Sequence, residues 1–431
     1  MAVRVSTLQR ITTGICASGV LLLVDCTMPN PAFDERETMG DATEVVGDGE
    51  DEPGDGDSND GDGDGDGNGD GDGDGDSGDG DGDGDPGDGD GDGDPGDGDG
   101  DGPLCGAPEH YADCDFNDQD DLTDSPFAAL GLGCTGPDSE TIPVVEPALT
   151  ANNPASWRVA THFGEAEGPH FGGYLWAAHD NEFVSPGGDL PDIPPNTSGA
   201  ILILSTGLLP EPDESGGVVL QPGSQTNSDN NANASGGEFP EPISPQLGSN
   251  FGQGGNPFYD CDGVNDCSDS LYEQWFVDGW NQLHNKMWLK FKVTPPAEVY
   301  GYMFDFAFFT SEYPDFVNTT YNDMFVAWSN SEAYTGNLTF IGQSPMNTTS
   351  LAQADGFSHT DEDPALAGTG FEGYGSTNWL RARGPVAPGE EVEITLFMSD
   401  LGDKNNGSVV LLDNFRWDCG GCEVDDCGFT P

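Results

Sequence analysis

Residues 299–309 read VYGYMFDFAFF and decide the fold, because an aromatic side chain recurs at every second position. Side chains alternate between the two faces of an extended chain, so this spacing predicts a β-strand with one aromatic face in the core. The rings on that face are Tyr300, Tyr302, Phe304, Phe306 and Phe308.

Other stretches have the same character. SGAILILSTG (198–207) is an apolar run typical of a buried strand, and MWLKFKV (287–293) places Lys290 and Lys292 opposite its apolar side chains. EVEITLFM (391–398) and SVVLLDNFRW (408–417) complete the set, and turns rich in Gly, Pro, Asn and Asp separate the stretches. The pattern predicts an all-β fold for the domain at 137–431, a jelly-roll-like β-sandwich with long loops.

Two segments depart from this pattern. SDSLYEQWFVDGWNQL (268–283) is the best helix candidate, although its aromatic residues could instead pack a loop. Residues 208–258 are polar and rich in Gly and Pro, and so long an insertion is either mobile or functional.

The composition is strongly acidic. The chain of 431 residues holds 80 Asp and Glu against 11 Lys and Arg, for a formal net charge of −69. Such a surface repels nucleic acid and anionic lipid and attracts cations, so neither nucleic acid nor a membrane surface is an expected partner.

The N-terminus, residues 1–26, resembles an export signal. Arg4 and Arg10 precede an apolar core at 11–24, which is too short for a comfortable membrane span. Cys26 ends this region and is a candidate for lipidation, although the preceding Asp25 fits a lipoprotein signal poorly. An ordinary cleaved signal peptide is the alternative.

A disordered linker follows at 27–102. Residues 47–102 are almost entirely Gly and Asp, with 23 Asp, two Glu and no basic residue. With almost nothing apolar to bury, the segment predicts a spacer spanning roughly 40 Å that holds the later residues away from an anchor. It lacks the closing carboxylate of a calcium loop, so we expect diffuse Ca²⁺ condensation there rather than a defined site.

Beyond the signal the chain holds eight cysteines, starting in a lead-in segment at 103–136. An even number in an exported chain predicts disulfides, with many connectivities left open. The cysteines are Cys105, Cys114, Cys134, Cys261, Cys267, Cys419, Cys422 and Cys427.

An acidic, amide-rich loop interrupts the apolar sequence directly after the aromatic strand, in FFTSEYPDFVNTTYND (308–323). Carboxylate and amide oxygens are the ligands that Ca²⁺ prefers, while Asn and Asp also form turns by bonding their own backbone. The candidate ligands are Glu312, Asp315, Asn318, Asn322, Asp323 and, within the strand, Asp305, whose burial would be costly without a partner.

Two further acidic segments allow a metal or a turn. YDCDGVNDCSDS (259–270) places Asp260, Asp262 and Asp266 around a glycine with the spacing of a calcium loop, or a disulfide pins a simple turn there. In SDLGDKNNGS (399–408), Asp400 and Asp403, with Asp413 beyond, stabilise a hairpin or share a metal.

Catalysis has little support in the sequence. The six histidines form no known metal or nucleophile motif, and no nucleotide-binding glycine loop occurs. We therefore expect no enzyme. Five tryptophans suggest sugar-stacking platforms, with burial in the core as the alternative: Trp275, Trp280, Trp288, Trp328 and Trp379.

Three of these stretches together resemble one family. SGAILILSTG, FDFAFFTSEYPDFVNTTYNDMFVAWSN and GEEVEITLFMSDLGDKNNGSVVLLDNFRW are similar, in order, to segments of the bacterial, myxobacterial-type choice-of-anchor L domain. The resemblance implies surface display and adhesion, and it brings no catalytic residues. With no sorting signal at the C-terminus, we expect any anchor to be N-terminal.

These observations predict an exported, surface-tethered binding or adhesion protein on an acidic spacer, with Ca²⁺ as the one expected cofactor. The ligand would be an extracellular glycan or protein, and the membrane would be reached only through a lipid on Cys26. A secreted hydrolase acting on polysaccharide and a purely structural coat component are the alternatives.

Overall fold

The computed structural model describes residues 105–108, 111–112, 114, 126–165, 171–172, 199–225, 233–248, 257–422 and 427–429. All of them belong to the second of the two compact units into which the chain divides, Gly91–Pro431. The predicted signal peptide, Cys26 and the Gly-Asp linker lie outside the described residues. Within the described part, no helix is both long and apolar enough to span a membrane.

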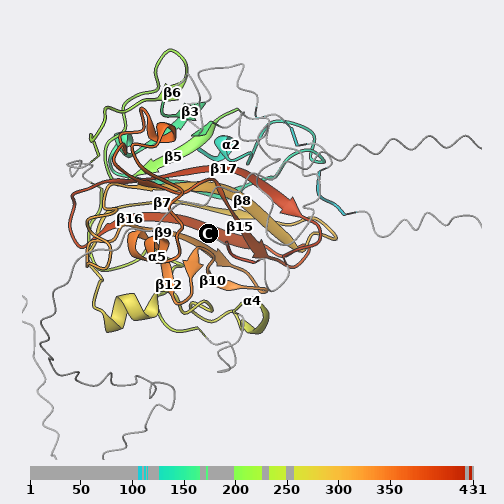
Figure 1. Ribbon diagram of the computed structural model, residues 1–431. Coiled ribbons are helices and arrows are strands. Elements are labelled where there is room, and N and C mark those ends of the chain that lie inside the picture. Colours follow the sequence, from blue (N-terminus) through green and yellow to red (C-terminus); the bar gives the residue numbers. More distant parts are fainter. Residues whose placement is uncertain are drawn as a thin grey trace, which may run out of the picture. The chain divides into compact units, whose positions relative to one another are not determined.

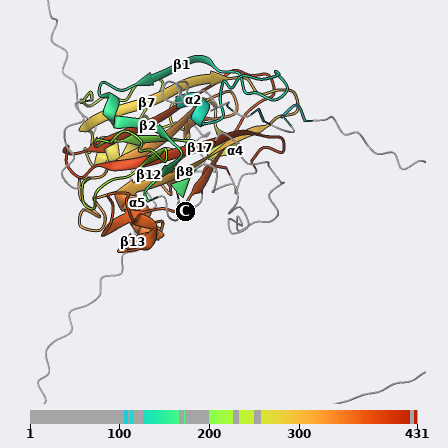
Figure 2. The same cartoon turned by 90° about the horizontal axis from the view of Figure 1, so that it is seen from above.

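The first sheet has seven strands in the order β1-β7-β16-β9-β12-β11, with β10 beside β9. β7, β16 and β9 cross the middle of Figure 1, and Figure 2 shows β1 beside β7 at the edge of the sheet. The strands are β1 (Val145–Thr150), β7 (Leu283–Val293), β9 (Met324–Asn330), β10 (Thr335–Asn337), β11 (Phe340–Ile341), β12 (Ser344–Asn347) and β16 (Val392–Leu401).

The second sheet also has seven strands, in the order β13-β14-β8-β17-β5-β2, with β15 beside β8. Its strands are β2 (Trp157–Ala160), β5 (Ile201–Ser205), β8 (Gly301–Thr310), β13 (His359–Asp361), β14 (Tyr374–Ser376), β15 (Leu380–Pro385) and β17 (Ser408–Asp418). A small third sheet joins β3 (His162–Phe163) to β4 (Phe171–Gly172) and β6 (Gly217–Val218).

The main core lies between the two large sheets, as the sequence predicts. β8 contributes Tyr302, Phe304, Phe306 and Phe308, whereas Tyr300 precedes the strand and is exposed. The ring of Phe306 lies 5.5 Å from that of Phe325 on β9, so aromatic contacts join the sheets. The apolar side chains of β7 and β16 complete this core, which confirms the all-β prediction and is consistent with a β-sandwich.

The outer faces of the central strands are buried too, which explains why β8 and β17 carry no exposed residue. The small sheet and the loop around Phe371 cover the second sheet. The segment around Phe239 and Ile243 covers the first sheet, with the ring of Phe239 lying 4.5 Å from Trp275. Part of the insertion predicted at 208–258 therefore packs as a covering layer.

Helical structure is sparse in the described part. The lead-in segment forms a single turn, α2 (Pro126–Ala129), and two further short helices are α4 (Pro257–Asp260) and α5 (Thr348–Gln353). The described part also contains two 3₁₀ turns, η1 (Pro154–Ser156) and η3 (Pro364–Leu366). The helix expected at 268–283 is wrong in extent, because only the π-helical turn η2 (Glu273–Val277) forms there. Trp275 turns into the core layer over the first sheet, so tertiary packing overrides the helical pattern.

The eight cysteines that follow the predicted signal peptide form four disulfides, as expected. Cys105 pairs with Cys419 across 314 residues of sequence, which ties the lead-in segment to the end of β17. The remaining pairs are Cys114–Cys134, Cys261–Cys267 and Cys422–Cys427. Tyr111 reinforces the long-range bridge, since its hydroxyl oxygen accepts a hydrogen bond from the backbone N–H of Trp417 at 3.1 Å.

Replacing Cys105 and Cys419 together by Ser should lower the free energy of unfolding by about 2–5 kcal/mol, because this bridge restricts the unfolded chain over a long separation. The matched control replaces Cys422 and Cys427, which are separated by 5 residues, and should lose about a third as much. Guanidinium unfolding of both double variants measures the difference. Equal losses would contradict the expectation.

Candidate metal centre

Three carboxylates, two from the loop between β8 and β9 and one from β16, meet at one end of the two large sheets. Glu312 follows β8 in the second sheet, Asp323 precedes β9 in the first sheet, and Asp400 lies on β16. One oxygen from each lies within 4.8 Å of the other two. The site therefore forms where the chain crosses from one sheet to the other.

Local structure aims these side chains at one point. The pairing of β16 with β7 shifts register between Met398 and Asp400, and such a bulge redirects a side chain. The backbone N–H of Asn322 donates to the carbonyl of Leu401 at 3.2 Å, which fixes the loop before β9 against the end of β16. Gly402 has φ +95° and lies so close to this loop that a Cβ there would be 2.5 Å from the carbonyl oxygen of Thr320.

One oxygen of Glu312 and one of Asp323 have hydrogen-bond partners. Oε2 of Glu312 accepts from the backbone N–H of Asp323 at 2.8 Å and from the hydroxyl of Thr348 at 3.0 Å. Oδ2 of Asp323 accepts from the hydroxyl of Thr206, at the end of β5, at 3.1 Å. These bonds connect elements of both sheets around the cluster.

The remaining carboxylate oxygens have no hydrogen-bond partner, although all three side chains are at most 1% exposed. They are Oε1 of Glu312, Oδ1 of Asp323 and both oxygens of Asp400. Burial, together with the neighbouring charge of Asp323, raises the pKa of Glu312 and of Asp400 well above the ordinary value. Burial also raises the pKa of Asp323. Buried carboxylates so arranged require either protons or a cation.

The other residues predicted in this loop serve different purposes. Asp315 and Asn318 are exposed, and the amide oxygen of Asn318 accepts from the side chain of Gln353 at 2.8 Å. Asn322 is buried, and its amide oxygen accepts from the backbone N–H of Thr349 in α5 at 3.0 Å. Of the four carboxylates predicted around this loop, Glu312 and Asp323 join the cluster.

Asp305 lies apart from this cluster. It is fully buried on β8, where Nε and Nη2 of Arg381 on β15 donate to its two oxygens at 2.7 and 3.0 Å. The side-chain amide of Asn414 donates to Oδ2 at 2.7 Å. The predicted partner for this buried charge is therefore an arginine on the neighbouring strand, so Asp305 does not join the carboxylate cluster.

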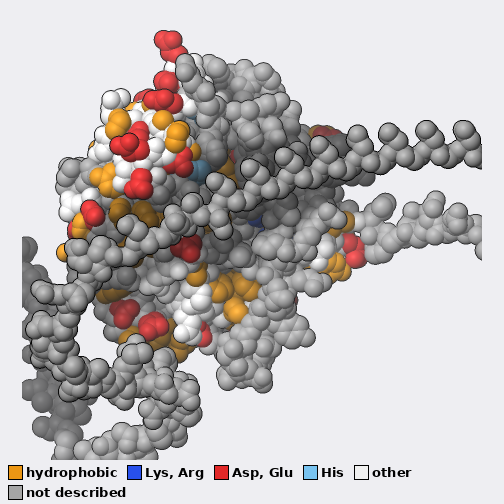
Figure 3. Space-filling view, viewed as in Figure 1, with side chains coloured by type: hydrophobic (Ala, Val, Ile, Leu, Met, Phe, Trp, Pro, Cys, Tyr) orange, Lys and Arg blue, Asp and Glu red, His pale blue; other side chains and the backbone are white. Residues whose placement is uncertain are grey.

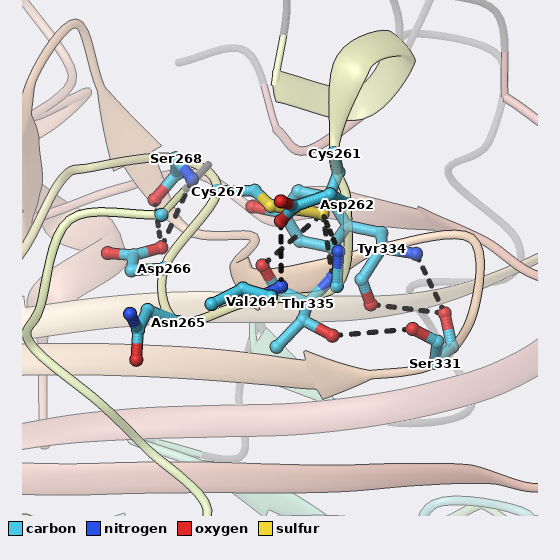
Figure 4. The surroundings of a disulfide bond; sticks show 12 residues. Cys261, Asp262, Val264, Asn265, Asp266, Cys267, Ser268, Ser331, Tyr334 and Thr335 are labelled. Atoms are coloured by element: carbon cyan, nitrogen blue, oxygen red, sulfur yellow. Dashed lines mark hydrogen bonds between the residues drawn. A yellow bond between two sulfur atoms is a disulfide. The ribbon is translucent and has the colours of Figure 1, made fainter. Parts of the chain in front are cut away.

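The second predicted calcium loop is organised by its disulfide and by backbone hydrogen bonds (Figure 4). Oδ1 of Asp262 accepts from the backbone N–H of Val264 at 3.0 Å, which forms a local turn. The carboxylate of Asp266 accepts from Ser268, Leu271 and Asn337. Asp260 ends α4, and its side chain lies outside what the structure describes. Among the described residues, these carboxylates join no metal-type cluster.

A shallow hollow of about 550 Å³ opens beside the disulfide turn. Lys292 offsets part of its negative charge, since its ammonium lies 3.1 Å from Glu391. No aromatic side chain lines the hollow, whereas a sugar-stacking platform needs one. The lining residues are Asp262, Gly263, Lys292, Asn330, Ser331, Glu332, Thr335, Glu390, Glu391 and Glu393.

The tryptophans predicted as stacking platforms do not form an exposed group. Trp275, Trp328 and Trp379 are each at most 7% exposed, and Trp280 and Trp288 are half-buried against the outer core. On the face drawn in Figure 3, acidic side chains are prominent and Lys and Arg are scarce.

The Arg381→Ala variant should lose about 3–5 kcal/mol of unfolding free energy, because it leaves the Asp305 carboxylate buried without its cation. Lys292→Met is the matched control. Its partners Glu146 and Glu391 are 68% and 54% exposed, so solvent screens these ion pairs and the loss should be much smaller than for Arg381→Ala. Chemical denaturation of both variants measures the difference, and similar losses would refute the assigned role of Arg381.

Stability should also depend on the protonation of Asp266. Burial raises its pKa from 3.8 to about 6, against the opposing effect of its hydrogen bonds. The folded state therefore binds this proton more tightly than the unfolded chain does. The resulting stability is fully present below about pH 4 and is lost as pH rises through about 6.

The amplitude is on the order of 3 kcal/mol. The unfolding free energies of the wild type and of Asp266→Asn are measured at matched pH values. From below about pH 4 to above about pH 6, the wild type should lose this amount of stability relative to the variant. Parallel pH profiles for the two proteins would show that folding does not shift the pKa of Asp266.

Comparison with known proteins found one family model that matches part of the chain. No curated protein and no solved structure gave a significant match to the chain. The myxobacterial type implied by the sequence resemblance stays a prediction. Residues 215–416 match the family model of the Choice-of-anchor L domain, a span that runs from the start of β6 into β17 and includes Glu312, Asp323 and Asp400.

Proposed function

We propose that this protein is exported, anchored at the cell surface and displays its β-sandwich as a binding or adhesion domain at the end of an acidic spacer. The family match supports an extracellular or surface-associated protein. The apolar N-terminal core, the candidate lipidation site Cys26 and the Gly-Asp segment 47–102 support the anchor and the spacer.

The disulfides are the observation that carries this proposal. Each of the eight cysteines after the N-terminal region is paired, and the four bridges extend from Cys105 at the start of the described residues to Cys427 near their end. Such bridges persist in oxidising compartments and are rare in the reducing cytosol. The Cys105–Cys419 bridge also links the segment that follows the predicted spacer to the residue directly after β17, so the start and the end of the domain are joined covalently.

A polysaccharide hydrolase is less well supported. Glycoside hydrolysis needs two carboxylates that flank a bond of the substrate and are therefore reachable from a cleft. Among the described residues, the compact cluster of Glu312, Asp323 and Asp400 is buried. The hollow beside Asp262 is lined by several carboxylates, but it is open and shallow rather than a cleft that could flank a sugar bond. The absence of an enzymatic activity stays a prediction, and a coat component remains an alternative that differs from our proposal in having no ligand.

Surface display can be tested in intact bacterial cells that produce the full chain. An antibody against the β-sandwich should label unpermeabilised cells, and the protein should fractionate with membranes. The Cys26→Ala variant should still be exported but should be released into the medium, because a lipid supplies the expected anchor. Deletion of 47–102 should keep the membrane fraction unchanged and reduce antibody access.

Labelling that requires permeabilised cells would refute display at the surface. Ligand binding is then tested with the purified full chain on glycan and extracellular-protein arrays. A reproducible ligand supports the binding function, and the absence of any ligand from displayed protein favours the coat component.

A further inference from the structure

We propose that Glu312, Asp323 and Asp400 bind one Ca²⁺ ion, which joins the two large sheets of the domain at the end where β8 leads into β9. Glu312 and Asp323 come from the two ends of one loop and Asp400 from β16, and one oxygen of each already lies within 4.8 Å of the other two. The inference is independent of where the protein is displayed.

The unpartnered oxygens are the first observation in favour of an ion. Four carboxylate oxygens in the cluster accept no hydrogen bond, although the side chains are buried. A buried polar atom without a partner costs about 1–3 kcal/mol, and more when it is charged. Hydrogen bonds hold Glu312 and Asp323 through their other oxygens, so the unpartnered oxygens remain available to a ligand.

The second observation is the absence of a basic partner within the described residues. None of the ion pairs found there involves these three carboxylates, and the charges that raise the pKa of Asp400 are all acidic, namely Asp323, Glu312 and Asp403. Asp305 provides an internal comparison, since it is equally buried but is neutralised by Arg381. A bound cation would neutralise the carboxylate cluster as Arg381 neutralises Asp305.

The ligand type favours Ca²⁺ among the common ions. All three groups offer oxygen, whereas Zn²⁺ sites usually include nitrogen or sulfur. Mg²⁺ retains several waters and dehydrates reluctantly, which suits a buried, closely spaced set of carboxylates poorly. Ca²⁺ accepts six to eight oxygens in flexible geometry and can use either one or both oxygens of a carboxylate. Asp400, with both oxygens unpartnered, offers such a bidentate ligand.

An ion here would act as a structural connection. Glu312 belongs to the loop leaving the second sheet, while Asp323 and Asp400 belong to the first sheet. Thr206 and Thr348, which hold the carboxylates from outside, extend the connection to β5 and to α5. Removing the ion would leave three buried carboxyl groups at the crossing between the sheets that must either repel one another or take up protons, so this end of the domain should loosen first.

The test uses the full chain and CaCl₂ alone, with thermal unfolding as the readout because the acidic spacer would add heat to a calorimetric titration. Protein stripped with EDTA should gain on the order of 5 °C in Tm when Ca²⁺ is added well above its Kd. MgCl₂ and NaCl at matched ionic strength should give a much smaller gain. The Glu312→Gln and Asp400→Asn variants should lose most of the Ca²⁺-dependent gain, and in EDTA they should unfold no earlier than the wild type.

Asp315→Asn is the matched control, since it removes one charge from an exposed side chain of the same loop and should keep the full gain. Sensitised Tb³⁺ luminescence of the wild-type chain, displaced by Ca²⁺ and absent in Asp323→Asn, gives a second measurement if one variant folds poorly. The proposal is overturned if Ca²⁺ does not raise the wild-type Tm, if Mg²⁺ raises it as much, or if Asp400→Asn responds like Asp315→Asn.

Discussion

The burial of central strands on both faces is the constraint on which the rest of the structure depends. β8 and β17 have no exposed residue because the opposite sheet covers one face and an outer layer covers the other. A strand in this position must be apolar nearly throughout, and any charge on it needs a partner within the protein. Asp305 meets this requirement through the two hydrogen bonds from Arg381.

The same constraint acts where the buried strands end. The chain leaves β8 inside the protein, so the first carboxylate after the strand, Glu312, is still fully buried. Asp323 is buried for the matching reason, as the residue before β9, and Asp400 because β16 lies between β7 and β9. Three carboxylates thus share one interior position, no basic residue in the described part of the chain pairs with them, and the proposed cation would offset both their burial and their mutual repulsion.

Local pattern was enough to predict the strands and the burial of individual side chains. Alternation identified the inward faces of β7, β8 and β16, and it predicted that Asp305 would be buried and in need of a partner. The identity of that partner depended on pairing between β8 and β15, with Arg381 opposite Asp305. Strand order is a long-range property that spacing does not encode, and the disulfide connectivity was open for the same reason.

In the candidate site too, local sequence spacing predicted one part and long-range strand pairing determined the rest. Glu312 and Asp323 share a loop, so their spacing suggested a common ligand, whereas Asp400 joins them only through the pairing of β16 with β9 and the bulge beside it. Asp315 and Asn318 have the same chemistry but point outward, because a loop that links two sheets buries only its two ends.

Export and the cation site are mutually consistent in physical terms. Extracellular calcium modules function with dissociation constants of about 10⁻⁴–10⁻³ M, which matches the ion supply outside the cell rather than inside it. Disulfides likewise form after export. Before export the domain would lack both its covalent bridges and its ion, and three repelling carboxylates would oppose closure of the crossing between the sheets. A domain built in this way becomes fully stable only in the compartment where it would be displayed.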